Sequence, residues 1–161
     1  MAVLKTQDIK LSALLKEKHI NLSLKGSDKK QILRELAEIV AKSAKLKDKK
    51  AFLSAVIKRE KLGSTGIGNG VAIPHAKIDE VKGFVLGFGR REGGIDFEAL
   101  DGEKTFLFFV LAAPKDEVGG HLKILAKIAH IVQDKFIIEQ LKRAKDKYDA
   151  LKIISMFDKK L

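Results

Sequence analysis

The centre of the chain carries a glycine-rich stretch, residues 63–75, that reads Gly-Ser-Thr-Gly-Ile-Gly-Asn-Gly-Val-Ala-Ile-Pro-His. Four glycines in its first eight residues permit tight turns and a close approach of other groups to the backbone. Val71–Ile73 then predict a short buried strand, which Pro74 cannot extend because it lacks a backbone N–H. The pattern therefore places the imidazole of His75 at the end of a buried strand, beside backbone that an anion can approach.

Helical patterns lie on both sides of this stretch. Upstream, apolar residues recur at helical spacing over about residues 28–44, and a second helix is expected over about residues 48–61. Downstream, a helix follows the glycine pair 119–120, and shorter helices are expected near 134–143 and 147–155. The glycine-rich stretch thus lies between two helical regions.

The predicted strands fall mainly between these helices. Phe84–Phe88 and Thr105–Ala112 both indicate strands, and the second is apolar on both faces, as in a buried central strand. A further short strand is expected over His19–Leu24, where polar and apolar residues alternate. The order of elements predicts an α/β fold, a mixed β-sheet sandwiched between α-helices, in a single domain over residues 1–161. The order of strands within the sheet does not follow from the sequence.

The composition restricts the classes of protein that fit this sequence. The chain has 161 residues and no cysteine, which excludes disulfide scaffolds, Fe–S clusters and thiol catalysis. Its longest apolar run, Phe106–Ala113, is far shorter than the roughly 20 residues of a membrane-spanning helix. The N-terminus lacks the apolar segment of a signal peptide, so we expect a cytoplasmic protein without membrane insertion.

The charge of the chain is strongly positive. The 32 Lys and Arg residues, set against 21 Asp and Glu residues, give a formal net charge of +11, as in proteins that bind nucleic acid or anionic surfaces. The basic residues, however, are spread along the chain among acidic ones, and one Tyr and no Trp offer little to stack on bases. A lysine-rich solvated surface is the favoured interpretation, and a basic nucleic-acid-binding protein is the alternative.

The glycine-rich stretch does not match the known nucleotide-binding loops. A dinucleotide loop reads G-x-G-x-x-G between a strand and a helix, whereas Gly66, Gly68 and Gly70 follow a helix and give G-x-G-x-G. A P-loop requires lysine where this chain has Asn69. His75 itself fits a nucleophile, a general base, a metal ligand or a histidine that merely ends a strand. No further ligands lie at short spacing, so we expect no metal and no cofactor.

Four segments together resemble one protein family, in the same order along the chain. They are Arg59–Lys77, which contains the glycine-rich stretch, then Gly94–Gly102, Leu111–Pro114 and His121–Ala126. This combination resembles enzyme IIA of the sugar phosphotransferase system (PTS), of the fructose, mannitol and nitrogen-regulatory type, and is nearest to stand-alone nitrogen-regulatory IIA proteins. The resemblance covers about residues 8–155. Ala76 stands where the family usually has glycine, a small-for-small change.

The resemblance implies a phosphoryl carrier with His75 as the phosphorylated nucleophile. The phosphoryl group would come from a phosphohistidine on the small carrier HPr or its nitrogen-branch paralogue. Imidazole suits this task because it is largely neutral near pH 7 and has a nucleophilic nitrogen lone pair. The resemblance assigns the attack to Nε2. Nδ1 then needs an acceptor for its hydrogen, which we expect to be a backbone carbonyl.

Further site residues follow from the same resemblance. His121 corresponds to the second active-site histidine, and Arg59 to an arginine whose guanidinium can bind phosphate in a fork. From the sequence alone, both also fit solvated residues at helix ends. Ser64, Thr65 and Gly66 are candidates for a phosphate loop, in which the hydroxyls either donate to the phosphoryl group or only cap the turn. No functional role is assigned to His19, His130, Asp96 or Asp101.

The resemblance also implies the partners. A regulatory IIA would receive phosphate from an HPr-like carrier, and its phosphorylation state would select a regulated kinase or transporter. The sequence shows no fused IIB or IIC segment, which favours this role over sugar uptake. The alternative is a fructose- or mannitol-type IIA that passes phosphate to a separate IIB. Exposed apolar residues near His75 and the glycine pair 119–120 are expected to receive the donor, and the chain is expected to be a monomer or a weak oligomer.

Overall fold

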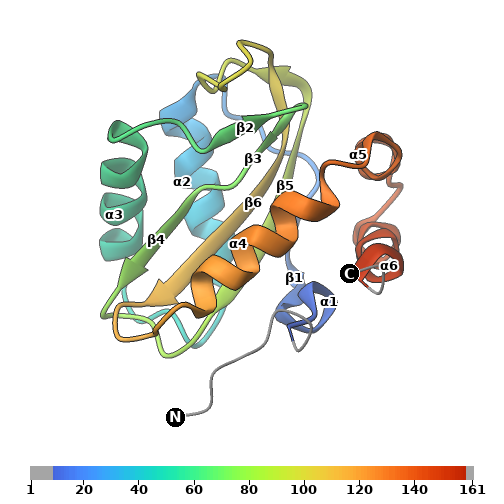
Figure 1. The fold of residues 1–161 in the computed structure, drawn as a ribbon. Helices are drawn as coiled ribbons and strands as arrows, with labels where there is room; N and C mark the ends of the chain where they lie inside the picture. Colours follow the sequence, from blue (N-terminus) through green and yellow to red (C-terminus); the bar gives the residue numbers. More distant parts are fainter. Residues whose placement is uncertain (1–8, 159–161) are drawn as a thin grey trace.

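The computed structural model describes residues 9–158, which form a sheet with helices on both of its faces (Figure 1). Within this range the chain runs α1 (Leu11–Leu14), β1 (Leu15–Asn21), α2 (Lys29–Val40), α3 (Lys49–Lys61), β2 (Gly66–Gly68), β3 (Val71–Ala72), β4 (His75–Ile78), β5 (Val85–Ile95), β6 (Thr105–Pro114), α4 (Gly120–Ile131), α5 (Lys135–Lys142) and α6 (Lys147–Asp158). The predicted α/β class is confirmed.

The sheet is mixed, with the strand order β1-β5-β6-β3-β2. Strands β3 and β4 both pair with β6 in parallel, and β1 pairs with β5 in parallel, whereas β5 and β6 are antiparallel. The central strand β6 is buried at almost every position, because helices cover both faces of the sheet at this point. This explains why its sequence is apolar on both faces.

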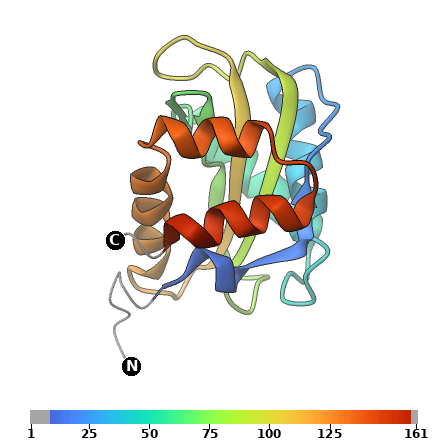
Figure 2. The ribbon, with the colours of Figure 1, turned by 90° about the vertical axis from the view of Figure 1, so that its right-hand side faces the viewer.

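Two hydrophobic cores flank the sheet. Helices α2 and α3 cover one face, and α1, α4, α5 and α6 cover the other; Figure 2 shows α5 and α6 lying across that second face. Alternate residues of β6 supply both cores: Phe109 packs in the core under α1, α4, α5 and α6, and Phe108 packs in the core under α2 and α3. Strand β5 has glycine at position 87, where a Cβ atom would lie 2.7 Å from Ile39 of α2.

Most predicted helices are confirmed within a few residues. Aspartates cap four of the helix N-termini: the carboxylate of Asp28, Asp48, Asp134 or Asp146 accepts a hydrogen bond from a backbone N–H two or three residues further on. Such caps satisfy N–H groups that have no partner inside the helix. Helices α2, α3, α5 and α6 therefore begin where the sequence predicts.

The N-terminal strand and the strand next to His75 differ from the prediction. Strand β1 spans Leu15–Asn21 rather than His19–Leu24, and it follows a short helix, α1, that the sequence analysis did not identify. The prediction that His75 ends a strand is also wrong in detail, because His75 begins β4. Pro74 divides one line of pairing along β6 into β3 and β4, so His75 lies directly after the interruption.

No helix within residues 9–158 is long and apolar enough to cross a membrane.

Candidate active site

His75 is held where two short strands meet. The N–H of Ile73 donates to the carbonyl of Thr65 (3.0 Å), and the N–H of Leu111 on β6 donates to the carbonyl of Pro74 (3.0 Å). Beyond this point His75 itself pairs with Leu111 in the β4–β6 ladder. The backbone before the ring is therefore held by Thr65 as well as by the central strand, and His75 itself is held by the central strand.

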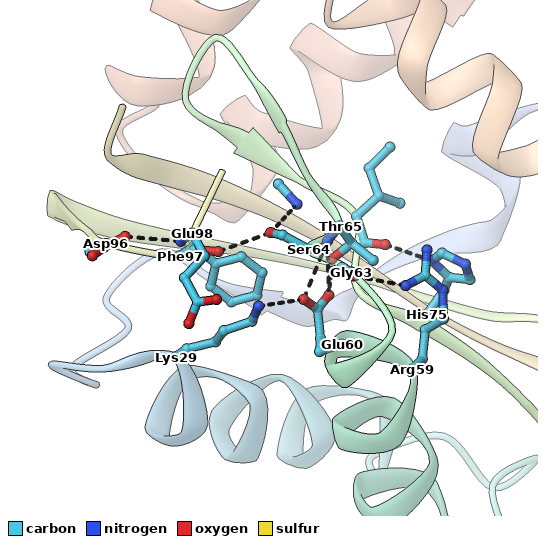
Figure 3. A network of polar contacts seen from close by, with 12 residues as sticks. Lys29, Arg59, Glu60, Gly63, Ser64, Thr65, His75, Asp96, Phe97 and Glu98 are labelled. Atoms are coloured by element: carbon cyan, nitrogen blue, oxygen red, sulfur yellow. Dashed lines mark hydrogen bonds and ion pairs between the residues drawn. The ribbon is translucent and has the colours of Figure 1, made fainter. Parts of the chain in front are cut away.

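The imidazole of His75 has a defined tautomer. Its Nδ1 lies 2.7 Å from the carbonyl oxygen of Ile73 (Figure 3). A carbonyl can only accept a hydrogen bond, so Nδ1 carries the hydrogen and the lone pair of the neutral ring is on Nε2. This is the backbone acceptor that the sequence analysis expected.

The pKa of His75 is lower than the ordinary value of 6.5, mainly because burial disfavours the charged ring. The hydrogen bond to Ile73 opposes this shift, the nearby Arg59 guanidinium adds to it, and the Glu60 carboxylate opposes it. The resulting decrease in the pKa keeps the ring neutral at pH 7. A neutral ring with a free Nε2 lone pair is a nucleophile.

One cleft of about 690 Å³ brings three of the predicted site residues together. His75 of β4, His121 of α4 and Arg59 of α3 all line it. The cleft also contains the lysines at positions 58, 77 and 115 and the exposed side chain of Leu62. An anion in this cleft would therefore meet several positive charges around His75.

His121 lies at the first turn of α4, where helix N–H groups have no intrahelical partner. Gly119 precedes the helix in a left-handed conformation, with φ of 79°. The Nδ1 atom of His121 is buried and has no hydrogen-bond partner among residues 9–158. Burial lowers the pKa of His121, the positive charge of Lys77 and the neighbouring His75 lower it further, and Glu117 opposes them. The ring is thus neutral at pH 7, and His121 lines the cleft together with His75.

Arg59 occupies the last turn of α3. Its Nη1 donates to the carbonyl of Gly63 (2.8 Å), and its side chain lines the same cleft as His75. Figure 3 shows the guanidinium beside the His75 ring. The sequence places Arg59 there because α3 ends just before the glycine-rich stretch. A guanidinium has five N–H donors, so one bond to the loop leaves capacity for a phosphoryl oxygen.

Ser64, Thr65 and Gly66 are not among the residues that line this cleft. The hydroxyl of Ser64 donates to the carbonyl of Phe97 (2.9 Å) and accepts from the N–H of Gly66 (3.0 Å). The hydroxyl of Thr65 donates to the carboxylate of Glu60. Both hydroxyls are therefore engaged within the loop, which fits the turn-capping interpretation of these residues. That they contact a phosphoryl group stays a prediction.

Glu60 is a residue that the sequence analysis missed. It is buried, with 6% of its surface exposed, and its carboxylate forms an ion pair with Lys29 (2.7 Å). In the sequence it stands among Lys58, Arg59 and Lys61, and it has the appearance of an ordinary solvated charge. Only its position on the inner side of α3 distinguishes it, and no local pattern reveals that position.

The remaining histidines and aspartates lie outside the cleft. His130 is exposed near the end of α4, and His19 is buried in β1 with no hydrogen-bond partner for either ring nitrogen among the residues described. Asp96 and Asp101 each accept a hydrogen bond from the backbone N–H two residues further on, and Asp101 also accepts from the N–H of Asn69 in the glycine-rich stretch (3.0 Å). No group of three or more His, Asp or Glu side chains in residues 9–158 is arranged to hold a metal ion.

Comparison with known proteins gives consistent matches. The profile of the family described as "Phosphoenolpyruvate-dependent sugar phosphotransferase system, EIIA 2" matches residues 13–156. A nitrogen regulatory protein of Bradyrhizobium diazoefficiens is 41% identical over 126 residues, which cover 77% of this chain and 80% of that protein. The crystal structure of nitrogen regulatory protein IIA-Ntr from Neisseria meningitidis superposes with a TM-score of 0.83 at 32% identity, covering 89% of this chain and 98% of that one.

A larger relative contains the same unit. The fructose-specific EIIABC component of Bacillus subtilis is 34% identical over 151 residues, or 94% of this chain. The matched part is only 24% of that protein, so the chain spans about a quarter of its length. The similarity to this relative therefore concerns one segment of a longer protein.

Proposed function

This chain belongs to the EIIA 2 family of the phosphoenolpyruvate-dependent sugar phosphotransferase system, and on that premise we propose that His75 is its phosphorylated residue. The family makes the chain a phosphocarrier of the regulatory or the sugar type. The observation that carries the assignment to His75 is the hydrogen bond from its Nδ1 to the carbonyl of Ile73. That bond leaves the lone pair on Nε2, inside a cleft lined by Arg59 and His121.

The transfer needs few changes of covalent structure. The donor is a phosphohistidine on an HPr-like carrier; its P–N bond breaks while a new P–N bond forms to Nε2 of His75. The electron pair of the broken bond returns to the donor imidazole, and the His75 ring acquires positive charge. No proton has to leave, because Nδ1 keeps its hydrogen on the Ile73 carbonyl. What remains for the protein is positioning and charge stabilisation.

Arg59 and His121 supply the stabilisation in this proposal. The guanidinium of Arg59 binds one or two equatorial oxygens of the phosphoryl group, and His121 donates from its ring to another. The free N–H groups at the start of α4 favour the same negative charge. Lys77, which lines the cleft, adds to the positive field around the transferred group.

Three exposed apolar side chains next to the cleft form the docking face in this proposal. Leu62 lies at the end of α3, and Val118 and Leu122 flank His121; their exposed fractions are 84%, 83% and 60%. Contact between this face and the donor carrier would exclude water from the transferred phosphoryl group. Because the donor has to leave after each transfer, a small interface is expected.

A regulatory role is the first candidate. The nitrogen regulatory protein of Bradyrhizobium diazoefficiens is 41% identical to this chain, whereas a fructose-like EIIA component of Escherichia coli, which is also matched over most of its length, is 33% identical. We infer that the phosphorylation state of His75 controls a regulated kinase or transporter. Sugar uptake is the second candidate, since the fructose-specific relative is 34% identical to this chain; in that role the phosphoryl group passes to a IIB component.

The test is a phosphorelay with purified components. Enzyme I, an HPr-like carrier and phosphoenolpyruvate are incubated with the chain, and intact mass and acid lability are measured. We expect one acid-labile, base-stable phosphoryl group on the parent chain and on His130→Ala, and none on His75→Ala. Labelling that persists in His75→Ala would contradict the assignment. Rapid transfer from the labelled chain to a IIB component would favour the sugar-uptake role.

A further inference from the structure

Two neighbouring residues at the end of α3 lie on opposite sides of the glycine-rich stretch. Arg59 lines the cleft of His75 and bonds to Gly63. Glu60 instead lies behind the loop, at a separate hollow that it shares with Lys29 (Figure 3). The function proposed above uses Arg59 and leaves the buried charge of Glu60 without a role.

The carboxylate of Glu60 is held by several groups at once. It accepts from the backbone N–H of Thr65 at 3.2 and 3.3 Å and from the Thr65 hydroxyl. Lys29 of α2 forms the ion pair, and its Nζ lies 4.8 Å from the centre of the Phe97 ring. A buried carboxylate is costly unless it is paired and hydrogen-bonded. These contacts hold the Glu60 carboxylate and fix the position of Thr65.

The contacts continue from Thr65 to the reactive ring. The carbonyl of Thr65 accepts from the N–H of Ile73 at 3.0 Å, and the carbonyl of Ile73 accepts from Nδ1 of His75 at 2.7 Å. Together with the Glu60 contacts they form the Glu60–His75 chain, which consists of Lys29, Glu60, Thr65, Ile73 and His75. It connects a buried ion pair between α2 and α3 to the tautomer of the nucleophile.

We propose that Glu60 is a positioning residue for phosphoryl transfer: by holding Thr65 it fixes the Ile73 carbonyl, and that carbonyl keeps the hydrogen of His75 on Nδ1. This inference rests on the proposed role of His75 as nucleophile. A ring released from the carbonyl populates both tautomers, and a ring protonated on Nε2 has no lone pair in the cleft. The negative charge of Glu60 also favours the positive charge that the ring acquires during transfer.

The direct test compares two variants that each remove one carboxylate between α2 and α3. Glu60→Gln retains the size of the side chain and removes its charge. Glu38→Gln is the matched control, because Glu38 pairs with Lys49 across the same two helices at 2.5 Å, on an exposed surface away from the loop. Nitrogen-15 chemical shifts of the imidazole rings report the tautomer of His75 in each protein.

We expect the His75 ring to carry its hydrogen on Nδ1 in the parent and in Glu38→Gln. In Glu60→Gln we expect a mixture of the two tautomers. Labelling with phosphoramidate, a small donor that needs no docking, should be slowed about 10-fold in Glu60→Gln and unchanged in Glu38→Gln. In that reaction the P–N bond of phosphoramidate breaks, ammonia leaves, and the P–N bond to Nε2 forms. A purely structural role for Glu60 would lower stability without changing the tautomer.

The proposal is overturned if folded Glu60→Gln retains the parent tautomer and the parent labelling rate. If Glu60→Gln does not fold, Thr65→Val provides the test: it removes only the hydroxyl bond to Glu60 and should produce a smaller effect in the same direction. Parent values in Thr65→Val would then overturn the proposal. If the parent chain has the Nδ1 tautomer but is never labelled, the proposed function fails while the positioning role of Glu60 remains measurable.

Discussion

In the proposed mechanism, two separate features of its surroundings make His75 a nucleophile. Burial lowers the pKa of the ring and keeps it neutral, and the Ile73 carbonyl selects which nitrogen has the lone pair. The motif Ile-Pro-His produces the second feature, because Pro74 interrupts the strand and lets the side chain fold back toward the residue before the proline. A short sequence thus determines both the place and the tautomer of the ring.

Among single residues, Arg59 should contribute more to the phosphoryl transfer than to folding. Arg59→Ala removes a donor to the phosphoryl oxygens, and we expect labelling by phosphoramidate to fall about 100-fold, in the range seen when one donor to a developing oxyanion is lost. Arg34→Ala is the control, since Arg34 is an exposed cation of α2 outside the cleft. A comparable loss in both variants would indicate a general effect of charge and contradict the role of Arg59.

The elements around the cleft show how far the sequence predicts this fold. Helices α2 to α6, strand β6 and the start of β5 follow from periodicity, caps and apolar runs, because those signals are local. Strand β5 continues to Ile95, beyond the predicted Phe84–Phe88. Strand β1 and the pairing of β3 and β4 along one partner depend on contacts distant in sequence. His75, His121 and Arg59 could be identified in advance by family resemblance. Glu60 could not be identified, because its burial results from the packing of α3 against α2.

A substitution at Gly119 tests how much the start of α4 contributes to stability and to labelling. Its φ of 79° is unfavourable for a side chain, although a Cβ atom would meet no neighbour within 4 Å. Gly119→Ala should cost about 1 kcal/mol of unfolding free energy, measured with urea, and should also slow labelling because it displaces His121. Gly102→Ala, at φ of 74° in a turn away from α4, should cost a similar amount and leave labelling unchanged. Equal labelling of both variants at the parent rate would contradict the role of the α4 start.

At the scale of the whole molecule, a buried ion pair joins α6, the last described helix, to the helix that carries His121. Lys127 of α4 lies 3.1 Å from Asp158 of α6, and Asp158 also accepts from the N–H and the hydroxyl of Ser12 (both 2.9 Å). Burial alone would raise the pKa of Asp158, but these bonds outweigh it and lower the pKa. The described N-terminal and C-terminal segments are therefore tied to α4 by charge as well as by packing.

The histidines make the whole molecule sensitive to acid. Burial lowers the pKa of His19, His75 and His121 in the folded protein, so the unfolded chain binds more protons just below pH 6.5. Stability is therefore complete above pH 6.5 and is lost as the pH falls through the lowered values. Urea midpoints should decrease between pH 7.5 and pH 5, and the decrease should be smaller in His19→Leu than in the parent. A midpoint that rises toward pH 5 would contradict this.

The net charge of +11 has no assigned role in the phosphoryl transfer beyond the cations of the cleft. Nucleic-acid binding stays a prediction from composition. If it occurs, retention on duplex or single-stranded nucleic acid should decrease steeply with salt, because bound counterions are released. Absence of salt-sensitive retention would leave the lysine-rich solvated surface as the explanation.

The central claim concerns one atom, Nε2 of His75, and nuclear magnetic resonance tests it most directly. The chain, labelled with nitrogen-15, is phosphorylated by its carrier, and phosphorus–nitrogen couplings identify the nitrogen that holds the phosphoryl group. We predict a single phosphoryl group on Nε2 of His75, with the hydrogen of Nδ1 still present. A phosphoryl group on Nδ1, or on any other side chain, would contradict the account.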